Sequence, residues 1–369
     1  MAGLTDNSIF ISLLAVLFFG LSNGASIFSC IIGANAKSPK WAAINILLLQ
    51  RLGFLLMFIS TYAATGSHVF ALVIFFVSYG IYGIATGMSG PVYSVLISGT
   101  IHRNIPSFYG TYSMIGAFSG VLGAQVLRLV LERYDFPISF RWVFLMGLLV
   151  AMLSTLSLAI GISETKVIRT MHFTFSMIPG TVKDILSKNK KYRSFLMARI
   201  IAAMADMSIP FFIIYIGSLT DSPESIVGSL TTILLISNMA ASKIIGQAGK
   251  HYGPMIMLRI AVLAGALASI LAVFAPSVSW GFVIFTLVGF TVTGNIISNS
   301  VANIHFAGDG YVSFYAMTSG IIIAPFYIVF SFLGGIIASR FSIPVVFIIS
   351  ASLYTASFIM NLILSRRSA

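Results

Sequence analysis

The chain has 369 residues, of which 58% are hydrophobic and only 8% are charged, and its net charge is +12 at pH 7. A soluble domain carries roughly 25% charged residues, so this composition excludes a water-soluble globular protein. The positive charge does not indicate a nucleic-acid-binding protein, because the basic residues stand in short segments between apolar runs and not on one soluble face.

Apolar runs of roughly 20 residues, the length that crosses a bilayer as a helix, recur along the whole chain. They are continuously apolar, which excludes a β-barrel, and lipid offers the backbone no hydrogen-bond partners, so each run is predicted to be helical. We predict eleven spans, which in chain order are 8–33, 41–63, 69–98, 108–131, 141–162, 195–217, 225–247, 255–275, 279–303, 312–338 and 343–364.

A basic segment at 163–194 separates the fifth predicted span from the sixth. We expect it to be a cytoplasmic linker that is partly an amphipathic helix. The predicted fold is therefore all-α, a polytopic membrane protein with two pseudo-symmetric helical bundles. Residues 1–162 would form the N-terminal bundle of five spans, and residues 195–369 would form the C-terminal bundle of six.

The distribution of lysine and arginine predicts the orientation of the chain in the bilayer. The linker and alternate loops are basic, whereas the loops at 65–68, 221–224 and 275–277 contain no lysine or arginine. Because cytoplasmic loops carry the excess of basic residues, we expect a multi-pass protein of the plasma or inner membrane with a cytoplasmic C-terminus. The basic residues expected on the cytoplasmic side, besides those of the linker, are Lys37, Lys40, Arg103, Lys243, Lys250, Arg366 and Arg367. Those expected on the outer side are Arg128, Arg133, Arg141 and Arg340.

Short matches in the same order relate the two halves of the chain, which predicts a parallel internal repeat. The matching pairs are Leu4-Thr5-Asp6 with Leu219-Thr220-Asp221, Pro39 with Pro254, Thr86-Gly87 with Thr293-Gly294, and Ser107-Phe108-Tyr109 with Ser313-Phe314-Tyr315.

Two parallel-related bundles joined by a basic linker resemble the major facilitator superfamily, and the resemblance covers essentially the whole chain. That family carries a Gly-x-x-x-Asp-Arg-x-Gly-Arg loop in each half. In the second half, Gly246, His251 and Gly253 fit this pattern, but Lys250 stands in place of the acid. In the first half only Gly33 and basic residues remain. The resemblance implies transport by alternating access, with residues 246–253 at a cytoplasmic gate whose acidic lock is altered.

Aligning the two halves leaves the first bundle one span short. The counterpart of the span at 195–217 is the family's first helix, and nothing before residue 8 can supply it. The expected consequence is a laterally open groove beside 8–33 and 69–98. A start codon assigned too late and a truly shortened gene are the two explanations, and the first is favoured because Leu4-Thr5-Asp6 resembles an outer loop.

Charged residues inside spans indicate where a site could lie. Nine acids occur in the chain, and only Asp206 is near the middle of a span. A charge at that depth costs on the order of 2.5–3.5 kcal/mol, so it is rare without a role. Arg199 precedes it by two helical turns, on the same face to within about 20°, and Arg51 is the other mid-span charge. Asp206 could bind a proton or cation with an arginine as counter-charge, or these residues could form a structural pair.

The span at 279–303 carries Asn295, Asn299 and Asn303 on one stripe. Carboxamides offer donors and acceptors without charge, which suits the lining of a wet cavity, whereas the alternative is hydrogen bonding between helices. Three on one stripe favours cavity lining for at least one of them.

These patterns predict a secondary transporter of a small solute, which uses protons as well if Asp206 is a coupling site. The alternative is a truncated or degenerate homologue that does not transport, or a subunit. No enzyme site, cofactor motif, metal-binding cluster or nucleic-acid-binding surface is recognised in the sequence.

Overall fold

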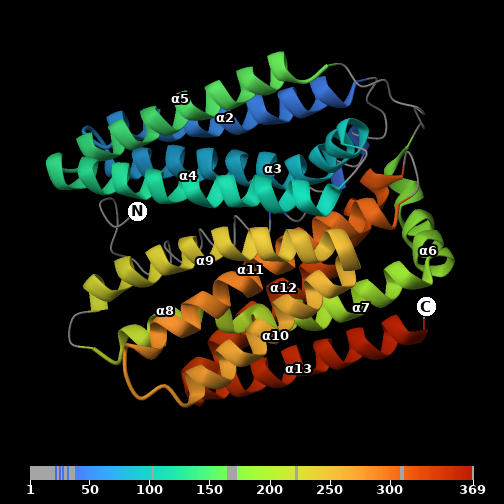
Figure 1. Cartoon of the computed structure of the whole chain (residues 1–369). Helices are drawn as coiled ribbons and strands as arrows, with labels where there is room; N and C mark the ends of the chain where they lie inside the picture. Colours follow the sequence, from blue (N-terminus) through green and yellow to red (C-terminus); the bar gives the residue numbers. More distant parts are fainter. Residues whose placement is uncertain are drawn as a thin grey trace. The chain divides into compact units, whose positions relative to one another are not determined.

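The computed structural model describes residues 21–22, 25, 27–28, 31–32, 38–101, 104–163, 173–220, 223–307 and 311–367. Over these residues the chain forms helices and short 3-10 turns and contains no strand, so the all-α prediction is confirmed (Figure 1). The predicted span 8–33 falls mostly outside the described residues, and so do Lys37, Arg103 and Asp221. The groove expected beside that span therefore stays a prediction.

Within the described ranges, ten helical stretches are long and apolar enough to cross a membrane, and they correspond to the predicted spans after the first. They are α2 (Pro39–Ala63), α3 (His68–Thr100), α4 (Ile105–Arg133), α5 (Ile138–Gly161), α7 with α8 (Lys190–Gly217), α9 (Pro223–Tyr252), α10 (Pro254–Val273), α11 (Trp280–His305), α12 (Val312–Arg340) and α13 (Ile343–Arg367).

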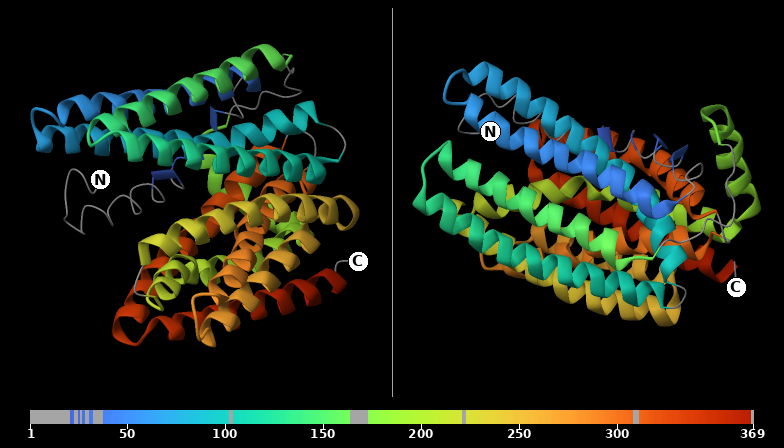
Figure 2. Two further views of the ribbon diagram at one scale, coloured as in Figure 1. Left: turned by 60° about the vertical axis from the view of Figure 1, so that its left-hand side comes forward. Right: turned by 90° about the horizontal axis from the view of Figure 1, so that it is seen from above.

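The chain divides into two compact units. Unit 1 comprises Met1–Thr100, Gly123–Pro179 and Asp309–Ile321, and within it α2 lies against both α3 and α5. Unit 2 comprises Ile101–Leu122, Gly180–Gly308 and Ile322–Ala369, and within it α10 lies against α11 and α13, while α13 also lies against α7 (Figure 2). The division into five-span and six-span bundles at the linker stays a prediction.

Local sequence signals explain where several helices begin. The Ser38 hydroxyl accepts from the Trp41 N–H at 3.5 Å, and Pro39 occupies the first turn of α2, where a missing N–H has no cost. The Asn189 side chain accepts from the Tyr192 N–H at 2.9 Å and caps α7. As a result α7 begins at Lys190, earlier than the predicted 195, and the segment before it contains the short helix α6 (Ile178–Lys188).

The predicted span at 195–217 is not one continuous α-helix. Helix α7 ends at Ala205, a 3-10 turn covers Asp206–Ser208, and α8 begins at Ile209. Pro210 in the first turn of α8 has no N–H to donate to the Asp206 carbonyl, which instead accepts from the Ile209 N–H. The break therefore falls at the acid that the sequence singles out.

The backbone conformation of Gly253, between α9 and α10, can be tested by substitution. Gly253 has φ 77° and ψ −177°, a conformation that only glycine adopts readily, whereas Gly228 lies within α9. A Cβ at either glycine would meet nothing within 4 Å. We expect Gly253→Ala to destabilise the protein by about 1–3 kcal/mol and Gly228→Ala to stabilise it slightly, because alanine favours helix. Thermal unfolding in detergent measures both, and equal effects would contradict the assigned backbone.

Candidate functional site

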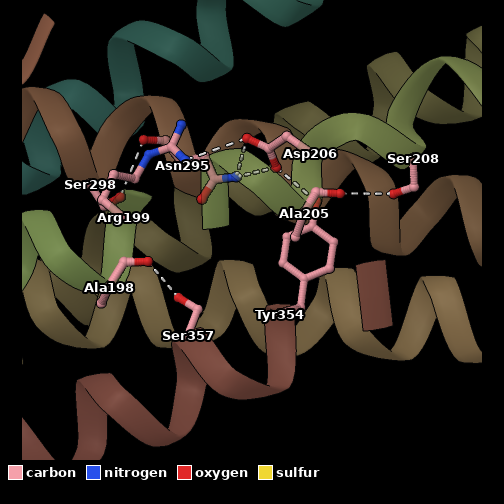
Figure 3. Close-up of polar contacts among 9 residues, drawn as sticks. All are labelled: Ala198, Arg199, Ala205, Asp206, Ser208, Asn295, Ser298, Tyr354 and Ser357. Atoms are coloured by element: carbon pink, nitrogen blue, oxygen red, sulfur yellow. Dashed lines mark hydrogen bonds and ion pairs between the residues drawn. The ribbon is translucent and has the colours of Figure 1, made fainter. Parts of the chain in front are cut away.

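The Asp206 carboxylate lies at the break between α7 and α8 and is only 4% exposed (Figure 3). Three side chains donate to it. The Tyr354 hydroxyl lies 2.7 Å from Oδ1, and the Asn295 Nδ2 lies 3.0 Å from Oδ1 and 3.3 Å from Oδ2. The Arg199 Nη1 lies 3.4 Å from Oδ2. One carboxylate thus connects α7, α11 and α13 inside unit 2.

The Arg199–Asp206 pair is a buried ion pair, since both side chains are at least nine-tenths buried. Burying two charges costs free energy, which is offset only when good geometry and further hydrogen bonds satisfy the remaining polar atoms. Asn295 and Tyr354 supply such bonds to the carboxylate. Within the described residues, Arg199 neutralises the negative charge of Asp206, and the neutral donors Asn295 and Tyr354 satisfy the carboxylate oxygens.

Hydrogen bonds from two serine hydroxyls to backbone carbonyls hold the elements that carry this cluster. The Ser357 hydroxyl of α13 donates to the Ala198 carbonyl of α7 at 2.7 Å (Figure 3). The Ser208 hydroxyl donates to the Ala205 carbonyl at 3.2 Å across the 3-10 turn. Ser357 stands one helical turn after Tyr354 in α13. Because its hydrogen bond fixes α13 against α7, Tyr354 has a defined position beside Asp206.

In the described part of the chain, three buried polar atoms of residues that the sequence singles out have no hydrogen-bond partner. They are Arg199 Nε and Asn295 Oδ1 of the cluster, and Asn299 Oδ1 four residues along α11. Arg199 and Asn295 are 8% and 3% exposed, so bulk water does not compensate them. Buried polar groups in proteins are nearly always paired, and exceptions mark places where a water or a ligand binds. The unpaired set offers one donor and two acceptors.

Asn303, the third asparagine of the predicted stripe, makes a hydrogen bond between helices. Its Oδ1 accepts from the Tyr192 hydroxyl at 3.0 Å, at the start of α7. Close by in sequence, the Asn189 Nδ2 donates to the Phe306 carbonyl at 3.0 Å. These bonds connect the beginning of α7 to the end of α11, while the part of Asn303 in a transport cavity stays a prediction.

Arg51 belongs to unit 1 and makes its hydrogen bonds within that unit. Its Nε and Nη2 both donate to the Ala151 carbonyl at 3.1 Å, and Nη1 donates to the Gln50 side chain. Gln50 in turn donates to the Thr86 hydroxyl at 2.9 Å. Within the described residues no carboxylate lies at ion-pair distance from Arg51, so the guanidinium joins α2 to α5 through neutral acceptors.

The residues of the predicted gate loop lie at the end of α9. Lys250 and His251 are in its last turn, and Gly253 makes the turn into α10. Gly246 packs closely against α4, where an added Cβ would lie 2.7 Å from the Gly110 Cα. The structure thus requires glycine at 246 and at 253, while their part in a gate stays a prediction.

Tyr354 was not singled out by its sequence, although it makes the shortest hydrogen bond to Asp206. It is one of 14 tyrosines and stands in an otherwise ordinary apolar span. Within the described residues there is no group of three or more His, Cys, Asp or Glu side chains that could hold a metal ion.

Comparison with solved structures identifies the fold. The chain is similar to the major facilitator superfamily transporter FucP in its outward conformation, with a TM-score of 0.75 at 12% identity over 99% of this chain and 92% of that one. It is also similar to the human organic anion transporter MFSD10, with a TM-score of 0.73 at 11% identity over 94% and 83%. A variant of the E. coli fucose:proton symporter FucP is similar as well, with a TM-score of 0.68 at 14% identity over 96% of this chain and 94% of that one. No family model and no curated protein matches the sequence. The fold is that of the major facilitator superfamily.

The buried ion pair makes a prediction about stability. Arg199→Met leaves the Asp206 charge without its counter-charge, so we expect a loss of about 3–5 kcal/mol. The double variant with Asp206→Asn should recover much of that loss. Lys188→Met breaks the exposed Lys188–Asp184 pair, whose side chains are 76% and 64% exposed, and should cost under about 1 kcal/mol. Thermal unfolding of the purified variants measures these effects, and similar losses at both pairs would contradict the assigned role of Arg199.

Proposed function

We propose that the chain is a secondary transporter of a small polar solute, working by alternating access in the cell membrane and coupled to protons at Asp206. The observation that supports it is the buried carboxylate at the α7–α8 break, held by Arg199, Asn295 and Tyr354 within a major facilitator fold. In this proposal residues 1–162 and 195–369 form the two bundles and 163–194 joins them on the cytoplasmic side.

The coupling argument rests on what protonation does to the cluster. An ionised Asp206 accepts from three donors at once, and two of them come from α11 and α13. Protonation removes the charge that attracts Arg199 and gives the carboxyl a proton to donate, so at least one of these bonds must rearrange. Gain or loss of a proton therefore changes how the α7–α8 break is held to its neighbours, which is the link that coupled transport needs.

The unpaired atoms favour an uncharged solute that carries hydroxyl groups. A hydroxyl both donates and accepts, and it could donate to Asn295 Oδ1 or Asn299 Oδ1 and accept from Arg199 Nε. An anionic solute would bind less favourably, because the positive charge of Arg199 is already neutralised by Asp206. The printed names of similar structures include both kinds of cargo, fucose and organic anions, and both belong in a first screen.

The proposed coupling leads to a prediction about transport. Purified protein in liposomes, screened with sugars including fucose and with organic anions, should accumulate a solute when a pH gradient is imposed. Asp206→Asn should abolish gradient-driven accumulation while leaving folded protein in the membrane. The matched control is Asp184→Asn, the same change at an exposed acid in α6, and it should transport as the wild type does.

Two outcomes would contradict this proposal in different ways. Undiminished accumulation by the Asp206→Asn variant would remove Asp206 from the mechanism. Absence of transport of every solute by well-folded wild-type protein would favour a homologue that does not transport.

Another prediction concerns the solute. Asn299→Ala removes one of the unpaired acceptors, so it should weaken binding of the transported solute about three- to tenfold, as expected for one hydrogen bond. Asn303→Ala, four residues along the same helix, removes the acceptor of Tyr192 and should lower stability with little change in affinity. Isothermal titration with the solute found in the screen separates the two. Equal affinity losses would place the solute elsewhere.

A further inference from the structure

Tyr354 is completely enclosed, although its hydroxyl needs a partner. The residue is 1% exposed, and its hydroxyl donates to Asp206 Oδ1 at 2.7 Å. A buried phenol is retained at little cost only where its O–H has an acceptor. The Asp206 carboxylate is that acceptor, so the position of the tyrosine and that of the acid depend on each other.

The ring of Tyr354 occupies space that a glycine leaves open. A Cβ added at Gly265 of α10 would lie 2.8 Å from the Cε2 and Cζ atoms of Tyr354 and 3.0 Å from the Cγ2 of Thr291. Contacts under 3.0 Å force a shift, and the ring of Tyr354 is the group that such a Cβ meets first. Any larger residue at 265 must push the phenol away from where it now lies.

We infer that Tyr354 is a positioning residue for Asp206, and that Gly265 is the residue that permits this position. The phenol O–H fixes the Oδ1 edge of the carboxylate from α13, opposite to the ion pair that Arg199 makes with Oδ2. Asn295 bonds both oxygens from α11. With Tyr354 in place the carboxylate has one orientation, and both its ion pair and its protonation depend on that orientation.

The inference extends the proposed function, since it rests on Asp206 as the site where a proton binds. The three donors come from three different helices, so loss of the phenol bond leaves the carboxylate held from α7 by Arg199 and from α11 by Asn295, and no longer by Tyr354 of α13. Sequence patterns alone would assign Tyr354 and Gly265 to ordinary helix packing, and the test must separate these two roles.

The experiment uses the full chain in nanodiscs and infrared difference spectra recorded across a pH series. The carboxyl C=O stretch of protonated Asp206 is identified as the band lost in Asp206→Asn. In Tyr354→Phe, which keeps the ring, this band should move to higher wavenumber, because one hydrogen bond to the carbonyl is removed. The midpoint of its titration should also move, by about one pH unit, as expected for one bond to a charged group.

Gly265→Ala should shift the band in the same direction, because the added methyl displaces the ring. Two matched controls have no expected effect. Tyr215→Phe removes a hydroxyl from α8 that makes no bond to Asp206, and Gly228→Ala adds a methyl in α9 where nothing lies within 4 Å. If Gly265→Ala does not fold, the Tyr354→Phe variant alone carries the test.

A second measurement does not depend on protonation. The melting temperatures of Tyr354→Phe, Asp206→Asn and the double variant form a cycle, and a bond between the two side chains predicts clear non-additivity. Additive effects, or an Asp206 band and midpoint unchanged in Tyr354→Phe, would overturn the inference. Non-additive melting without any Asp206 band at any pH would support the positioning role and overturn the proposed proton coupling instead.

Discussion

A carboxylate buried among apolar helices must be neutralised and fully hydrogen-bonded, and Asp206 meets that requirement with side chains from three segments of unit 2. Arg199 supplies the counter-charge, Asn295 bridges both oxygens, and Tyr354 completes the set. Removing any one of these three side chains leaves the carboxylate short of a hydrogen-bond donor or of its counter-charge. The constraint explains why a buried arginine, a fully enclosed tyrosine and a serine bond from α13 to α7 all occur around one 3-10 turn.

The break in the span is the second part of the same arrangement. Pro210 prevents α7 and α8 from forming one uninterrupted helix, and the acid lies at the first residue of the turn between them. Interrupted helices near a polar cluster are a recurring feature of transporters, where they place charged groups against a substrate or ion.

Arg51 in unit 1 is a buried charge whose hydrogen bonds go to neutral groups. Its guanidinium donates to a helix carbonyl and a glutamine side chain, so the charge is satisfied by neutral acceptors and joins α2 to α5. Arg259 in unit 2 is similar, since it donates to the side chain and backbone of Asn361 and joins α10 to α13. The Asp206 cluster differs because a proton can change the charge of one of its members.

The sequence by itself determined the all-α membrane architecture and the positions of ten spans, and it singled out Asp206, Arg199 and Asn295. Apolar run length and the cost of an intramembrane charge are local properties, so they can be read along the chain. Only the tertiary structure decided that Asn303 bonds to Tyr192, that Arg51 donates to Ala151 and Gln50, and that Tyr354 bonds to Asp206 in space that Gly265 leaves open. Residues 206, 265, 295 and 354 come together only when four helices pack, and no periodicity within one helix records which side chain a distant helix will present.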